Sequence, residues 1–304
     1  MDLGTWLDTW LSLYIMGGSL APSTKAMYRR AVQAVPPDLR GVQLTSLSAL
    51  DLLPWLLKVA KTHPRAAQLD RIMLSRALKV AAKLQLCRPD LVDPDTVPEL
   101  PHTAAKAAVL TAEEASRYLE AAQQSSAFVL LALCLCGLRR GEALGVRRQD
   151  IDFQEQTVAI VGQRIRIDGE YLYTKPKSRT SVRTLRLPKW LVEALAAQPR
   201  TVGGWIVDTT PERLAAAHKA TLKRAGIRAP VTLHGLRHTF ATLSAASGIP
   251  MKQLQQAMGH AKFQLTADTY ADHLPPVSET ATRLWKEHDW KSCVGLYPTQ
   301  GSNP

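Results

Sequence analysis

The sequence predicts a mainly α-helical protein of two domains, with one small antiparallel β-sheet in the second domain. Three observations support this fold class. Apolar residues recur at spacings of three and four in both the N-terminal and the C-terminal part of the chain. Four prolines interrupt the segment between the two parts, and β-branched residues concentrate in residues 151–186. A chain of 304 residues is long enough for two domains that each bury a core.

Residues 1–88 are expected to form a compact unit of four helices. In the first of these, the apolar residues from Leu3 to Tyr14 share one helical face. Ser23 is a candidate cap for the second helix, and a proline begins the fourth. The four expected helices cover residues 3–16, 23–35, 48–60 and 64–86. Residues 89–108 hold the four prolines and show little periodicity, so they are expected to form an extended connector.

Residues 109–304 are expected to form a mostly helical domain. A capping box, TAEE at residues 111–114, predicts the start of its first helix. A long apolar helix, 128–136, follows. The expected strands cover residues 157–161, 163–167 and 182–187, with Asp168-Gly169 as a hairpin turn. Helical patterns resume at residues 188–197, 211–225, 233–247 and 251–258.

The charge of the chain indicates a polyanionic partner. The formal net charge is +12 at pH 7. Lysines and arginines that neutralise phosphates release condensed counterions, so nucleic acid is the first partner to consider. The sequence shows no apolar run of membrane-spanning length and no signal peptide at its start, and we therefore expect a cytoplasmic protein. The cysteines lack metal-ligand spacing and are expected to be buried thiols: Cys87, Cys134, Cys136 and Cys293.

Four separated segments carry the residues that indicate chemistry. GLRRGE, at residues 137–142, ends the long apolar helix and contains Arg139. HGLRHTF, at residues 234–240, contains His234 and Arg237. A Gly-His pair ends with His260, and Tyr270 follows ten residues later. Each segment alone is a weak signal, but the four in this order and spacing are a strong one.

This constellation resembles the signature boxes of the tyrosine recombinase and phage integrase family, over about residues 109–275. The N-terminal helices are also similar, less specifically, to the core-binding domain of that family. The resemblance implies a two-domain clamp on duplex DNA, with a helical core-binding domain and an α+β catalytic domain. It implies a site-specific recombinase that integrates, excises or resolves DNA without metal or nucleotide cofactor. Because the helical unit starts at the first residues, we expect no additional arm-binding domain before it.

The chemistry explains why these residue types belong together. Attack on a DNA phosphodiester places negative charge on two non-bridging oxygens, and the guanidiniums of Arg139 and Arg237 offer forks of donors that fit them. A tyrosine phenol has a pKa of about 10, so it loses its proton more readily than a serine hydroxyl when it acts as a nucleophile, and it is regenerated as a good leaving group. Tyr270 would then hold the 3′ phosphate covalently, and this ester preserves the energy that religation needs.

Further roles follow from the resemblance. His234 would assist proton transfer from Tyr270, and His260 would hydrogen-bond the scissile phosphate. The departing 5′ oxygen needs an acid, which in the family is a lysine on a β-hairpin. Lys175 and Lys177 both qualify, and the register against the following residues favours Lys177.

The resemblance also implies partners. The exchange of two duplexes needs four strand cleavages, so a homotetramer on two DNA sites is expected, each with a specific core sequence. An accessory directionality protein is a further expected partner, and the protein would be associated with the nucleoid. Lys25, Arg29 and Arg30 are candidate DNA contacts, or else a solvated helix face. The apolar stripe after Leu274 packs either on its own domain or on a neighbouring protomer.

Two other functions remain open at this point. A DNA-binding regulator could keep the fold without catalysis, although the complete set of candidate catalytic residues argues against it. A type IB topoisomerase would share the chemistry but relax supercoils as a monomer. Other polar residues have structural interpretations: Glu142 orients its neighbours, Asp150 supports a turn, Tyr171 and Tyr173 pack on the sheet, and His238 and His273 are structural or surface residues.

Overall fold

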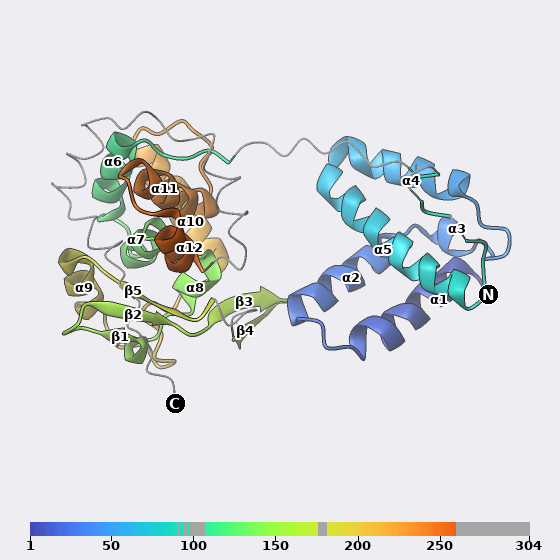
Figure 1. The fold of residues 1–304 in the computed structure, drawn as a ribbon, viewed down its shortest axis with the longest axis horizontal. Helices are drawn as coiled ribbons and strands as arrows, with labels where there is room; N and C mark the ends of the chain where they lie inside the picture. Colours follow the sequence, from blue (N-terminus) through green and yellow to red (C-terminus); the bar gives the residue numbers. More distant parts are fainter. Residues whose placement is uncertain (90, 94–95, 98–106, 176–180, 260–304) are drawn as a thin grey trace. The chain divides into compact units, whose positions relative to one another are not determined.

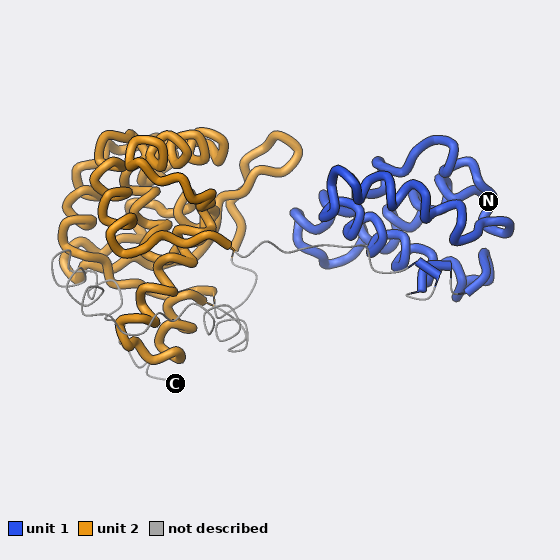
Figure 2. The backbone as a smooth tube through the Cα atoms, turned by 90° about the horizontal axis from the view of Figure 1, so that it is seen from above, with its two compact units in different colours: residues 1–105 blue, residues 106–304 orange. Residues whose placement is uncertain are grey.

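The computed structural model describes residues 1–89, 91–93, 96–97, 107–175 and 181–259. The chain divides into two compact units, unit 1 with residues 1–105 and unit 2 with residues 106–304 (Figure 2). The division falls within the segment that its prolines indicate is a connector. Within the described ranges, no helix combines the length and the apolar character that crossing a membrane requires.

Unit 1 is helical. Its described helical segments are, in order, α1 (Leu3–Trp10), the π-helix η1 (Leu11–Met16), α2 (Pro22–Ala34), α3 (Pro37–Arg40), α4 (Ala49–Thr62) and α5 (Pro64–Lys83) (Figure 1). Local signals begin these helices. The Asp2 side chain accepts a hydrogen bond from the backbone N–H of Thr5 at the start of α1. Pro64 occupies the first turn of α5, where its missing N–H costs no hydrogen bond.

The first expected helix, 3–16, changes type at Leu11. In η1 the backbone N–H of Gly17 donates to the carbonyl oxygen of Ser12, which is the wider spacing of a π-helix. The extra residue in this turn buries Ile15 and leaves Tyr14 46% exposed. The prediction that Tyr14 lies on the apolar face was therefore wrong, because it assumed a regular α-helix with 3.6 residues per turn over the whole segment.

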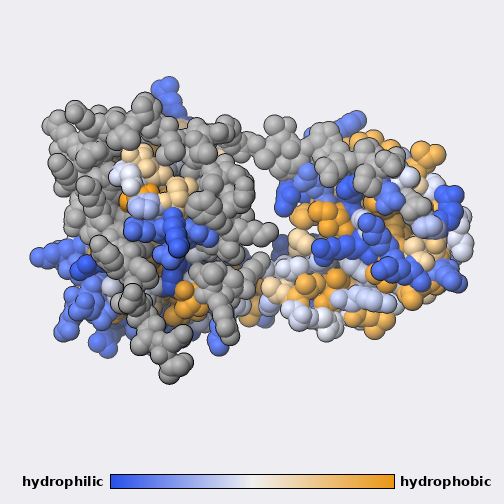
Figure 3. Space-filling view, in the orientation of Figure 1, coloured by the Kyte–Doolittle hydropathy of each residue, from blue (hydrophilic) through white to orange (hydrophobic). Residues whose placement is uncertain are grey.

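Two tryptophans of α1 hold the core of unit 1 together. The indole Nε1 of Trp6 donates to the carbonyl oxygen of Ala77 on α5 at 3.0 Å, in a buried hydrogen bond. The ring of Trp10 packs edge-on against Tyr28 of α2, with 5.6 Å between the ring centroids. The first helix is thus fixed to two other helices of unit 1 through its buried face. On the face shown in Figure 3, hydrophobic residues lie beside hydrophilic ones on unit 1.

Unit 2 combines helices with short strands. Its helices are α6 (Ala112–Ala122), α7 (Phe128–Leu135), α8 (Arg140–Leu144), the 3-10 helix η2 (Arg148–Asp150), α9 (Lys189–Ala196), α10 (Pro211–Arg224), α11 (Leu233–Ala246) and α12 (Met251–Met258). Its strands are β1 (Ile151–Asp152), β2 (Thr157–Ile160), β3 (Gln163–Ile167), β4 (Glu170–Thr174) and β5 (Arg183–Arg186). The predicted fold class, mainly α with a small part of antiparallel β-structure, is confirmed.

The apolar helix α7 forms the centre of unit 2. Every residue from Val129 to Leu135 is buried, and the helix contacts α6, α8, α9, α10 and α11. A helix that is apolar on all sides requires such an arrangement, because it has no face to present to water. Cys134 and Cys136 are buried in this region, as expected, whereas Cys87 is half-buried and Cys293 lies outside the described residues.

The strands form two antiparallel sheets instead of the single sheet expected. One sheet has the order β1-β2-β5, and β3 pairs only with β4 in the other. The break falls between β2 and β3, where Gly162 packs against Tyr173 so closely that a Cβ atom would lie 2.3 Å from its ring. The expected turn at Asp168-Gly169 is confirmed, since both residues have the positive φ that a tight hairpin needs.

The segment that enters unit 2 is bound to α11. The backbone N–H of Leu110 donates to the hydroxyl of Thr239 at 2.9 Å, and this buried hydroxyl donates to the carbonyl oxygen of Gly235 at 2.8 Å. Thr239 therefore joins the start of the unit to the helix that carries His234 and Arg237.

Replacement of this hydroxyl tests the joint. Thr239→Val keeps the shape of the side chain but leaves the buried N–H of Leu110 without an acceptor, so unit 2 should lose about 1–3 kcal/mol of unfolding free energy. Urea titration read by hydrogen exchange of α7 peptides measures this loss. Thr239→Ser keeps the hydroxyl and is the matched control. Equal stability of the two variants would contradict the assignment.

Candidate active site

The turn between α7 and α8 places Arg139 beside α11. Gly137 has a φ of +94°, and a Cβ atom on it would lie 2.8 Å from the ring of Phe240 on α11. Only glycine allows both this backbone conformation and this close approach. The turn therefore packs directly on α11, the helix of Arg237, and Arg139 caps the following helix α8.

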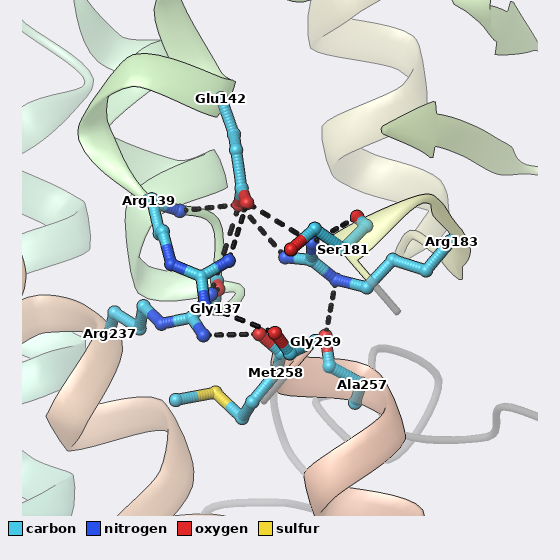
Figure 4. A network of polar contacts seen from close by, with 9 residues as sticks. All are labelled: Gly137, Arg139, Glu142, Ser181, Arg183, Arg237, Ala257, Met258 and Gly259. Atoms are coloured by element: carbon cyan, nitrogen blue, oxygen red, sulfur yellow. Dashed lines mark hydrogen bonds and ion pairs between the residues drawn. The ribbon is translucent and has the colours of Figure 1, made fainter. Parts of the chain in front are cut away.

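A buried carboxylate joins three guanidiniums at this place (Figure 4). Glu142 is 4% exposed. Its carboxylate accepts hydrogen bonds from the backbone N–H of Arg139 at 2.8 Å and from Nη1 of the same residue at 2.7 Å. It also accepts from Nη1 and Nη2 of Arg183 on β5, at 3.2 and 2.9 Å. Nη1 of Arg237 lies 3.8 Å from the same carboxylate. As expected from the sequence, Glu142 orients its neighbours.

These four side chains carry an excess of positive charge. Burial alone would raise the pKa of Glu142, but the hydrogen bond and charge of Arg183, followed by those of Arg139, lower it to about 2. The carboxylate is therefore ionised at neutral pH. Three guanidiniums against one carboxylate leave a formal charge of +2, which favours binding of an anion.

The two candidate catalytic arginines also converge on the end of α12. Arg237 is fully buried, and it donates from Nη1 to the carbonyl oxygen of Gly137 at 2.5 Å and from Nη2 to that of Met258. Nη2 of Arg139 donates to the carbonyl oxygen of Gly259 at 3.1 Å. The side chain of Arg139 is 34% exposed, so Arg139 offers surface to a ligand while Arg237 joins the framework.

His234 lies one helical turn before Arg237 on α11, at the surface. Its pKa is lowered, first by the protein around its ring and then by the charges of Arg237 and Arg139. The ring packs edge-on against His238, with 4.5 Å between the ring centroids. A neutral imidazole thus stands next to the arginine cluster at neutral pH, in the form that accepts a proton.

Three of the candidate catalytic residues lie outside the described residues: Lys177, His260 and Tyr270. Their nearest described neighbours are informative. The exposed residue Lys175 directly follows β4, and Gly259 is the last described residue before His260. The structure therefore brings together Arg139, Arg237 and His234, and the catalytic assignments of all six residues remain predictions.

The candidate DNA contacts of unit 1 have structural partners. Nζ of Lys25 donates to the carbonyl oxygen of Met16 at 2.7 Å, and a guanidinium nitrogen of Arg29 lies 3.8 Å from the sulfur of Met16. Both side chains thus bind the end of η1. Their role in DNA binding, with that of Arg30, stays a prediction.

Aromatic and guanidinium groups stack along the β3–β4 hairpin. The guanidinium of Arg147 lies over Tyr173 at 4.3 Å and over Trp205 at 4.7 Å, measured to the ring centroids. Tyr171 packs against the guanidinium of Arg164 at 4.8 Å. The interpretation of both tyrosines as sheet-packing residues is confirmed. Asp150 accepts from the backbone N–H of Arg147 at 2.9 Å and so supports the turn, as expected.

Arg183 was not among the functional residues that the sequence motifs predicted. A signal was available in the alternation of β5, where Arg183 and the buried Leu185 point to the same face of the strand. A charged residue in phase with core residues indicates a buried ionic partner.

Neutralising Glu142 should destabilise unit 2 in a pH-dependent way. Because its pKa is lowered from 4.5 to about 2, its contribution to stability is complete above pH 4.5 and is lost as the pH falls toward 2. Glu142→Gln should cost about 3–5 kcal/mol at pH 7, since it leaves buried guanidiniums uncompensated. Urea unfolding of the wild-type protein and of Glu142→Gln between pH 7 and pH 3 measures the difference in their free energies of unfolding. This difference should become smaller below pH 4.5. The exposed Glu155→Gln is the control, and a difference that stays constant over this range would contradict the ionic role.

Comparisons with known proteins agree with the motifs. The model of the phage integrase family matches residues 108–275. An integrase of Streptomyces ambofaciens is 28% identical to the chain over 314 aligned residues, which cover 90% of this chain and 77% of that integrase. A XerC-like tyrosine recombinase of Caldanaerobacter subterraneus subsp. tengcongensis is 26% identical over 171 residues, 46% of this chain. The chain spans only 43% of the length of that relative.

Solved structures share the fold. The Tn1549 transposon integrase in complex with transposon right end DNA has a TM-score of 0.74 and 20% identity, with 94% of this chain and 99% of that chain covered. A lambda integrase tetramer bound to a Holliday junction has a TM-score of 0.69 and 18% identity, covering 90% and 78%. Because the family model spans more than half of the sequence, the chain belongs to the phage integrase family.

Proposed function

We propose that the chain is a site-specific DNA recombinase that cleaves and rejoins strands through a covalent 3′-phosphotyrosyl link to Tyr270. The observation that carries this proposal is the meeting of Arg139 and Arg237 at the Glu142 carboxylate and at the end of α12. This end directly precedes His260 in the sequence. Residues from three separate motifs thus meet at one site that carries excess positive charge. Such a site favours the binding of a phosphate diester.

The cleavage step follows from the chemistry of these groups. The phenol oxygen of Tyr270 attacks the phosphorus, the bond from phosphorus to the 5′ oxygen breaks, and the 3′ phosphate stays on the enzyme. The phenol proton passes to the neutral imidazole of His234, whose lowered pKa keeps it available as an acceptor at neutral pH. The ammonium of Lys177 supplies a proton to the departing 5′ oxygen. Religation is the same sequence in reverse and needs no external energy source.

The arginines stabilise charge on the phosphate. Arg139 has the exposed surface from which its guanidinium reaches a non-bridging oxygen. Arg237, as the second guanidinium, contacts the phosphate once the atoms that cover it make room. His260 hydrogen-bonds the same phosphate. Fixed donors of this kind are each worth a factor of about 10²–10³ in rate, since they need no reorganisation as charge develops.

The units have separate tasks in this proposal. Unit 1 is the helical core-binding domain, with Lys25, Arg29 and Arg30 as candidate phosphate contacts, and unit 2 is the catalytic domain. The partner is double-stranded DNA with a specific core site, in the nucleoid of the cytoplasm. A homotetramer on two sites supplies the four cleavages of a complete exchange, as the lambda integrase tetramer on a Holliday junction suggests. An accessory protein sets the direction of the reaction.

A covalent-capture experiment tests the proposal. The full chain is incubated with a library of duplexes that carry a randomised core and a nick, so that the cleaved end diffuses away and the adduct accumulates. Wild-type protein should yield an adduct that resists SDS, with phosphotyrosine at residue 270 by mass spectrometry. Tyr270→Phe should lose the adduct completely, because it removes the phenol oxygen that forms the proposed covalent link.

Tyr171→Phe is the matched control, since it removes the phenol oxygen of an exposed tyrosine of unit 2, and it should form the adduct normally. An adduct that persists in Tyr270→Phe, or its absence with wild-type protein across the library, would refute the proposal. Relaxation of a supercoiled plasmid without sequence preference would instead indicate a topoisomerase.

A further inference from the structure

Arg183 occupies a buried position at the first residue of β5. Its side chain is 7% exposed, and it shares the inward face of the strand with Leu185. A fully buried guanidinium is costly unless acceptors surround it, so the position of each donor is informative. No motif that indicated chemistry in the sequence includes this residue.

The donors of Arg183 are directed at protein acceptors. Nε donates to the carbonyl oxygen of Ala257 at 2.6 Å. Nη1 donates to Glu142 at 3.2 Å and to the carbonyl oxygen of Ser181 at 3.0 Å, while Nη2 donates to Glu142 at 2.9 Å. The guanidinium is thus engaged by the protein on both its edges. It is placed to position other groups and not to contact the substrate.

Arg183 and Arg139 bind the same carboxylate and two neighbouring carbonyl oxygens. Arg139 is held at two points, the carboxylate of Glu142 and the carbonyl oxygen of Gly259. Arg183 binds the same carboxylate, and it binds Ala257, two residues before Gly259 at the end of α12 (Figure 4). The side chain of Arg183 therefore fixes both groups that hold the partly exposed Arg139.

The charge balance gives a second argument. A carboxylate with a single guanidinium partner forms a closed, neutral pair that competes with an incoming phosphate. Because Arg183 binds Glu142 through two donors, the carboxylate is shared, and Arg139 and Arg183 together keep a net positive charge. A lysine at this position would keep the charge but could not reproduce the planar fork.

We propose that Arg183 is a positioning residue for the recombination reaction, which aims the guanidinium of Arg139 at the scissile phosphate by fixing Glu142 and the end of α12. This inference rests on the proposed function of the site. It assigns Arg183 an effect on the rate of strand cleavage and no contact with DNA.

The test compares two substrates and three variants of the full chain. The substrates are a nicked duplex recovered by covalent capture and the same duplex with a methylphosphonate at the scissile position. The methylphosphonate lacks one negative charge, so its cleavage depends less on a correctly oriented guanidinium. The variants are Arg183→Met, Arg183→Lys and the control Arg186→Met, which removes an exposed arginine from the same strand.

Arg183→Met should lower the single-turnover cleavage rate of the phosphodiester about 10- to 100-fold, with unchanged DNA affinity. The decrease in the cleavage rate of the methylphosphonate should be at least several-fold smaller, because this substrate carries one negative charge less. Arg183→Lys should remain impaired on the phosphodiester, and it serves as the test protein if Arg183→Met does not fold. Arg186→Met should cleave both substrates at the wild-type rate.

Three results would overturn the inference: wild-type cleavage by folded Arg183 variants, an equal loss on both substrates, or a loss confined to DNA affinity. Hydrogen exchange supplies a readout that needs no DNA. Peptides from α8 and the end of α12 should exchange faster in the Arg183 variants than in Arg186→Met, and unchanged exchange would refute the link. If the wild-type protein forms no adduct, the proposed function fails, whereas this exchange comparison still decides whether Arg183 fixes the two segments.

Discussion

The architecture of unit 2 depends on one buried carboxylate and the guanidiniums that surround it. Glu142 comes from the first turn of α8, Arg183 from β5 and Arg237 from α11, so the interaction joins elements far apart in the sequence. Removing the Glu142 carboxylate leaves the buried guanidiniums of Arg183 and Arg237 without a negative partner, which is costly. The surplus positive charge of the cluster also favours the binding of an anion.

Packing around α7 makes this cluster possible. The helix is buried from Val129 to Leu135, and the backbone of Gly137, just after its end, packs closely on the Phe240 ring of α11. This contact sets the distance between the helix of Arg237 and the turn of Arg139. The carbonyl oxygens at the end of α12 complete the arrangement by accepting from both arginines. Helices and turns of the fold thus hold the side chains of Arg139 and Arg237 in place.

Local signals in the sequence predicted the elements that depend on local interactions. The capping box of Thr111 and Glu114 begins α6 in the structure, and the Asp168-Gly169 turn joins β3 and β4. Three-residue spacing on α11 correctly placed His234 and Arg237 within one turn. In each case the determining contacts lie within a few residues of one another, so a pattern in the sequence reports them directly.

Features set by tertiary contacts escaped prediction. The π-turn at Leu11 depends on which residue fits the core of unit 1, and the separation of the two sheets depends on the approach of Gly162 to Tyr173. The five-residue helix α8 is too short for a periodic signal. Arg183 was missed because the attraction to Glu142 acts across 41 positions of the sequence. The spacing of the motifs identified candidate residues for the site, but only the fold shows which guanidiniums bind the Glu142 carboxylate.

The most direct test of the central claim is a structure of the Tyr270→Phe protein bound to its DNA site. We expect the scissile phosphate within hydrogen-bonding distance of the Arg139 guanidinium, with the Glu142 carboxylate still bound by both Arg139 and Arg183. A phosphate located away from these arginines, or a carboxylate released from Arg183 in the bound state, would contradict this expectation.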